Sequence, residues 1–142
     1  MKIALYIAFQ NKSSIDCCKE IIDLISGNNQ LIIDSKVKND LDDSRSEKLV
    51  FFNSNERIDS DIDFVFAVGG DGTILRSITY VKDSNVPILG VNTGRLGFLT
   101  SVQKESISDA ISHIKNNKFS IINRTILKVK SRLGLFDGRV PH

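Results

Sequence analysis

Short apolar runs alternate with amphipathic stretches along most of this chain. Four runs have the length and the β-branched content of buried strands, and they cover residues 2–9, 31–33, 62–68 and 86–91. Apolar positions at helical spacing predict helices over residues 14–26, 73–82 and 106–116, and a weaker helix over 44–52. Residues 34–43 are polar and predict a loop. Repeated strand–helix units of this length predict an α/β fold, in which helices cover both faces of a parallel sheet.

The end of the chain has a different pattern. Residues 119–122 and 125–130 predict two strands with no helix between them, and residues 131–142 carry little periodicity. We therefore expect an α/β domain over residues 1–118, followed over residues 119–142 by the beginning of a truncated β-rich domain.

A glycine-rich loop follows the third apolar run and reads Gly69-Gly70-Asp71-Gly72-Thr73. Glycines let a backbone turn sharply and approach a ligand closely, and we expect a positive φ at Gly70. The helix predicted after the loop would point its first N–H groups at the loop, which favours phosphate. Asp71 is then a candidate base at a phosphate-handling site. An ordinary turn is the alternative, since Gly-Gly and Asp-Gly are common turn dipeptides.

A second glycine-containing loop, at residues 92–100, directly follows the fourth apolar run. Because the carboxyl ends of parallel strands meet at one edge of a sheet, we expect the two loops to line one cleft. Asn92 offers a donor and an acceptor, which suit a ribose or an amide. Phe98 can lie against a purine or nicotinamide ring, or it can pack the loop onto the core.

Composition and net charge limit the classes of binding partner that the sequence supports. A net charge of +2 over 142 residues gives no argument for nucleic acid or for an anionic membrane surface. No apolar run approaches the roughly 20 residues that a membrane-spanning helix needs. Cys17 and Cys18 are adjacent, have no metal-ligand spacing and suit small positions in the core, so a reducing cytoplasm is expected.

Taken together, GGDGTILR and ILGVNTGRLGFLT resemble the N-terminal domain of bacterial NAD kinases. The later stretch INRTILKV resembles the passage of that family into its second domain. The first motif alone also resembles diacylglycerol and sphingosine kinases. Residues 74–77 and the NTGRLGFL element favour the NAD kinase family, in which a Rossmann-like domain is expected.

The resemblance implies transfer of a phosphoryl group from ATP to the 2′-hydroxyl of the adenosine ribose of NAD, which gives NADP. It implies that Asp71 is the catalytic base and that Gly72 brings backbone close to NAD. Arg76 matches a position that contacts the dinucleotide, with an exposed helix arginine as the alternative. A divalent ion, Mg²⁺, would bridge the donor phosphates. The expected nucleotide-binding residues are Gly69, Gly70, Asp71, Gly72, Arg76, Asn92 and Phe98.

The chain departs from the family pattern after Lys130. NAD kinases carry a second, β-rich domain with an Asn-Glu or Asn-Asp pair, and no such pair follows here. A fragment and a reading-frame change are both open explanations, and in either case we expect this chain to be inactive. A non-catalytic nucleotide-binding fragment and a lipid kinase catalytic domain of the diacylglycerol kinase type are the alternatives. The full-length protein is expected to be a homo-oligomer.

Overall fold

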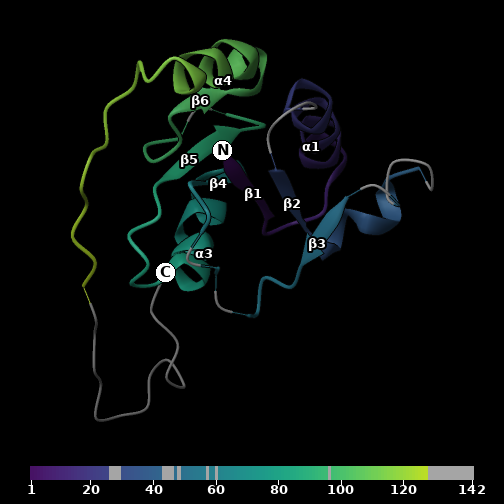
Figure 1. Cartoon of the computed structure of the whole chain (residues 1–142), viewed down its shortest axis with the longest axis horizontal. Coiled ribbons are helices and arrows are strands. Elements are labelled where there is room, and N and C mark those ends of the chain that lie inside the picture. The colour runs from purple at the N-terminus through teal and green to yellow at the C-terminus, as the bar shows by residue number, and fades with distance from the viewer. Residues whose placement is uncertain are drawn as a thin grey trace.

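The computed structural model describes residues 1–25, 30–42, 47, 49–56, 58–59, 61–95 and 97–127. Six strands within them form one sheet in the order β3-β2-β1-β4-β5-β6 (Figure 1). Every neighbouring pair is parallel, which confirms the predicted α/β fold. The strands are β1 (Lys2–Ile7), β2 (Gln30–Asp34), β3 (Val50–Phe52), β4 (Phe64–Gly69), β5 (Ile88–Asn92) and β6 (Val102–Gln103).

Helices cover both faces of the sheet, as the alternation of apolar runs predicts (Figure 1). Helices α1 (Lys12–Ile25) and α4 (Ile107–Lys115) pack on one face, and α3 (Asp71–Val81) packs on the other. Strand β1 serves both cores because successive side chains point to opposite faces. Its residues Ile3, Leu5 and Ile7 join the core under α1 and α4, whereas Ala4 and Tyr6 join the core under α3.

Two expectations between β2 and β4 are wrong. Residues 50–52, predicted as the end of a weak helix, form β3 and pair with β2, because Val-Phe-Phe suits the open edge of that strand. Residues 43–46 and 48 lie outside the described residues. Within the predicted loop, the 3₁₀ helix η1 (Ser35–Asp40) forms because the Asp34 carboxylate accepts the Lys36 N–H at 3.2 Å.

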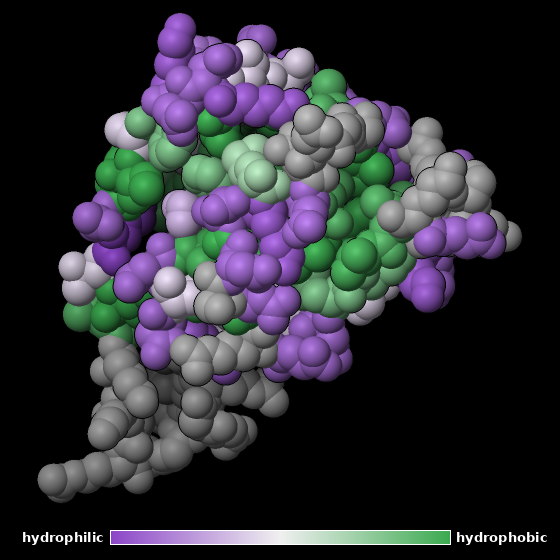
Figure 2. Space-filling model, in the orientation of Figure 1, coloured by the Kyte–Doolittle hydropathy of each residue, from purple (hydrophilic) through white to green (hydrophobic). Residues whose placement is uncertain are grey.

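Two strands were predicted after residue 118, but the described residues 119–127 form no strand. Residues 119–127 follow α4 without pairing with the sheet (Figure 1). Phe119 packs edge-on against Phe64, with ring centroids 5.4 Å apart. The other large apolar side chains of this segment are exposed, and they are Ile121, Ile122, Ile126 and Leu127. Figure 2 shows hydrophobic groups on the surface of the molecule in the same view. Residues 128–130 are not described, and the division into two domains stays a prediction.

The cysteines lie where a small apolar residue fits. Cys17 and Cys18 are buried in α1 against the sheet and are not joined in a disulfide. Burial raises the pKa of the Cys17 thiol to about 11, so the thiol is protonated at neutral pH. Among the described residues, no helix combines the length and the apolar character that crossing a bilayer requires.

Candidate functional site

The centre of the sheet contains a topological switch point. Strands β1 and β4 are neighbours, and the chain continues from β1 toward β2 on one side and from β4 toward β5 on the other. Open α/β sheets bind ligands outside the carboxyl ends of the strands at such a point. Helices α1 and α3 both begin at this edge, so their N-terminal N–H groups face the same region.

Gly69, not Gly70, makes the sharp turn at the end of β4. Gly69 has a φ of +151°, and a Cβ built there would overlap Thr73 Oγ1. Gly70 has a φ of −106°, so the expectation of a positive φ there is wrong. Gly70 is instead the N-cap residue just before α3, and its carbonyl accepts the Thr73 N–H at 2.9 Å. A Cβ on Gly70 or Gly72 would meet nothing within 4 Å. The space outside these two glycines is therefore open to a ligand.

The Asp71 carboxylate joins the two glycine loops. Its Oδ2 accepts the Phe98 N–H at 2.8 Å, and its Oδ1 accepts the N–H groups of Leu99 at 2.9 Å and Thr100 at 3.2 Å. These bonds, first those from Leu99 and Phe98, hold the pKa of Asp71 below its usual 3.8. The carboxylate is therefore ionised at neutral pH. The structure thus brings the two predicted loops together through a single side chain.

Asn92 shapes the second loop from within. Its Nδ2 donates to the Arg95 carbonyl at 2.7 Å, and its Oδ1 accepts the Gly94 N–H at 3.0 Å. The side chain is only 1% exposed, so both of its polar groups are engaged inside the loop.

The Phe98 side chain, in contrast, is 97% exposed. The alternative that Phe98 packs the loop onto the core is therefore wrong, and its ring is free to meet a ligand.

One further segment, residues 8–13, reaches the same edge and was not singled out from the sequence. The Arg76 guanidinium carbon lies 4.7 Å from the centre of the Phe9 ring, and both side chains are exposed. Ser13 Oγ, in the first turn of α1, donates to the Thr93 carbonyl at 2.8 Å. The only sequence signal for these contacts is that residues 8–13 also follow a strand of the parallel sheet.

Comparisons with known proteins decide the family. Residues 18–119 match the family described as ATP-NAD kinase N-terminal domain. This chain belongs to that family. The resemblance read from the two loop motifs is therefore confirmed, in preference to the diacylglycerol kinase alternative. The roles of the individual site residues stay predictions.

Bacterial relatives in the family align with nearly all of the chain. It is 34% identical over 145 residues to a NAD kinase of Christiangramia forsetii, with 100% of this chain and 49% of that protein covered. It is 37% identical over 130 residues to a NAD kinase of Flavobacterium johnsoniae, with 89% and 44% covered. The chain thus spans about half the length of these family members.

A solved structure shows the same fold. The crystal structure of yeast NADH kinase complexed with NADH superposes with a TM-score of 0.67 at 19% identity. The match covers 83% of this chain and 38% of the yeast chain. The Rossmann-like arrangement expected for the family is therefore confirmed.

Proposed function

We propose that the protein to which this chain belongs transfers a phosphoryl group from ATP to the 2′-hydroxyl of the adenosine ribose of NAD. In this proposal the chain supplies the cleft wall that carries Asp71. The observation that supports it most is the convergence of both glycine loops on one carboxylate at the switch point, in a member of the NAD kinase family. Such chemistry depends mainly on positioning and charge neutralisation.

The phosphate groups of the dinucleotide would lie outside the first loop. Gly70 and Gly72 leave space there, and the N-terminus of α3 directs N–H groups and a positive dipole toward it. Arg76, one turn into α3, would add a full positive charge that the Phe9 ring helps to orient. Gly69 would contribute by making the turn, and Asn92 by holding the second loop in shape.

Asp71 would orient the attacking hydroxyl and accept its proton. Among the described residues, one N–H group donates to Oδ2, so this oxygen keeps a lone pair for a further hydrogen bond. Because its pKa is lowered, Asp71 is a weak base that stays ionised. A weak base suits a reaction in which the proton of the attacking hydroxyl is removed late. The exposed Phe98 ring would stack on a purine or nicotinamide ring.

The metal ion would depend on the nucleotide for most of its ligands. Among the described residues there is no group of three or more His, Cys, Asp or Glu side chains that could hold a metal ion. A Mg²⁺ ion would be held mainly by nucleotide phosphate and water, as is common for this ion, and it would neutralise negative charge there. A cytoplasmic location suits the two free cysteines, and a homo-oligomer of the full-length protein stays a prediction.

The chain by itself is expected to bind nucleotide weakly and to lack turnover, because it spans about half of its relatives. Purified residues 1–142 would be assayed for NADP with millimolar ATP, NAD and Mg²⁺. Turnover of about 10 s⁻¹, which is typical of enzymes, would show that the remaining half of the relatives is dispensable.

The decisive test uses the chain extended to full length. Asp71→Asn should keep NAD affinity within a few fold and lower kcat by about 10²-fold or more, since Asn retains the shape and removes the basic oxygen. Asp109→Asn, on the exposed side of α4, is the matched control and should leave kcat unchanged. Retention of more than about a tenth of kcat by Asp71→Asn would contradict the proposed role.

A further inference from the structure

The middle of the second loop is held by one carboxylate. Both ends of the loop are fastened to the sheet: the Thr93 N–H donates to the Gly69 carbonyl at 3.2 Å, and the Ser101 N–H donates to the Gly90 carbonyl at 3.0 Å. Between these points, three consecutive N–H groups, those of residues 98–100, converge on Asp71. Successive backbone N–H groups of this kind form a concave seat for an anion. Here the anion comes from the protein itself.

Gly97 is the residue that makes this contact sterically possible. A Cβ built on Gly97 would overlap the Asp71 carboxyl group, including Oδ1, and would lie 2.7 Å from Oδ2. To relieve this overlap, either the loop or the Asp71 carboxylate, which the loop N–H groups hold, would have to move. The Gly97 N–H also donates to Thr100 Oγ1 at 3.3 Å, which closes the turn around the carboxylate. Any side chain at Gly97 must therefore push the loop and the carboxylate apart.

Other glycines near this site do not share the constraint. A Cβ on Gly94, in the same loop, or on Gly72, next to Asp71, would meet nothing within 4 Å. The loop therefore contains two glycines with opposite environments. Gly94 can accept a methyl group, and Gly97 cannot.

We propose that Gly97 is a positioning residue, which lets the second loop fold onto the Asp71 carboxylate and so fixes the carboxylate and the Phe98 ring relative to each other. The anchoring of the loop is a property of the chain alone. Its effect on phosphoryl transfer rests on the proposed function, because Asp71 and Phe98 would then contact the same nucleotide. A loose loop would leave both groups present but misplaced, and misplacement by about 1 Å can cost 10²-fold in rate.

Hydrogen exchange of residues 1–142 tests the anchor without substrate. In Gly97→Ala, the amides of residues 98–100 should exchange at least about tenfold faster than in the wild type, as expected for the loss of hydrogen bonds to a charged group. Gly94→Ala is the matched control and should exchange like the wild type. Asp71→Asn should also speed exchange in the loop, and amides in β1 and β4 should stay protected in all variants.

The outcomes separate the anchor from the proposed function. Unchanged exchange of residues 98–100 in Gly97→Ala, or equal acceleration in Gly94→Ala, would overturn the anchor. In the full-length protein, Gly97→Ala should lower kcat more than it changes the KM for ATP, and Gly94→Ala should change neither. If Asp71→Asn abolished turnover while Gly97→Ala left exchange and kcat intact, the proposed function would stand and the anchor would fall.

Discussion

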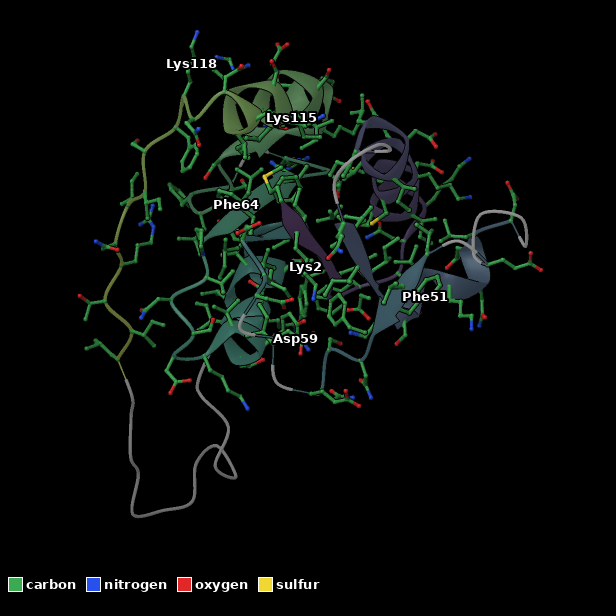
Figure 3. All side chains as sticks on the ribbon, viewed as in Figure 1. Lys2, Phe51, Asp59, Phe64, Lys115 and Lys118 are labelled. Carbon is green, nitrogen blue, oxygen red and sulfur yellow. The ribbon has the colours of Figure 1, made fainter. Side chains whose placement is uncertain are left out.

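Different interactions stabilise the two edges of the sheet at which the strands end and begin. At the carboxyl edge, loops with glycine at their tightest points are joined by backbone N–H groups that donate to Asp71. At the amino edge, long side chains pair through charge: Lys2 Nζ lies 2.8 Å from Asp61 Oδ1 and 3.7 Å from Asp59 Oδ2 (Figure 3). The first arrangement fixes the backbone of one loop against a short side chain of the other. The second leaves exposed carboxylates, for which water and salt ions can compete.

A cavity lies at the amino edge of the sheet, away from the candidate site. It has a volume of about 540 Å³ and is found between the strand starts, the end of α4 and Ile121. Much of its wall is apolar, with Met1, Pro87 and Ile114 among the lining residues. Asn117 and Ile121, which follow α4, also line the cavity. The converging N–H groups and the Asp71 carboxylate, and not this cavity, mark the candidate site.

The largest effect is expected where the carboxyl edge is tightest. Gly69→Ala should lower the free energy of unfolding by about 2–4 kcal/mol, because Ala is strained at a φ of +151° and its Cβ overlaps Thr73. Gly70→Ala is the matched control and should change stability by less than about 0.5 kcal/mol, since its Cβ has open space. Urea denaturation of both variants measures the difference. Equal stabilities would mean that the turn at the end of β4 is relaxed.

An element of the fold could be predicted from the sequence where its own residues determine it, and not where a neighbouring element does. Strands β1, β2, β4 and β5 were predicted, as were the three helices, because each has its own apolar pattern. Strand β3 was not, because a three-residue edge strand is chosen by its partner β2, and β6 has only two residues. Short elements of this kind leave no period to read.

Some features of the candidate site were likewise predicted from the sequence, and others were not. Both glycine loops were located, because each directly follows a buried strand. The assignment of the positive φ to Gly70 was wrong, because adjacent glycines are equivalent until the packing of Thr73 distinguishes them. The partners of Asp71 were missed, because they are backbone N–H groups 27 to 29 residues away, and a backbone donor has no sequence signature.

An intermediate effect is expected in acid. The folded state lowers the pKa of Asp71 below 3.8, so the stability that this group contributes is present above about pH 4 and is lost as the pH falls through the folded pKa. Asp71→Asn should therefore flatten the dependence of the urea midpoint on pH between about 5 and 2. Because the donors are neutral N–H groups, 1 M NaCl should change this difference little. A parallel pH dependence in both proteins would show that Asp71 forms no anchor in solution.

The smallest effect is expected at the amino edge. Hydrogen bonding to Asp61 and the charges of Asp61 and Asp59 raise the pKa of Lys2 above 10.5, so its contribution to stability is present at neutral pH and is lost as the pH rises through the folded pKa. Both carboxylates are about two-thirds exposed, with side-chain exposures of 67% for Asp61 and 70% for Asp59. Lys2→Met keeps the apolar stem and the backbone N–H that donates to Asp63 at 2.7 Å.

Lys2→Met should therefore lower the melting temperature by less than about 4 °C, and by still less in 1 M NaCl, which screens exposed ion pairs. Lys118→Met, just beyond α4, is the matched control for loss of one positive charge (Figure 3). Scanning calorimetry of the three proteins at pH 7, at low and high salt, measures both differences. A loss as large as that of Gly69→Ala would show that the two edges are equally constrained, and the contrast between them would then have to be abandoned.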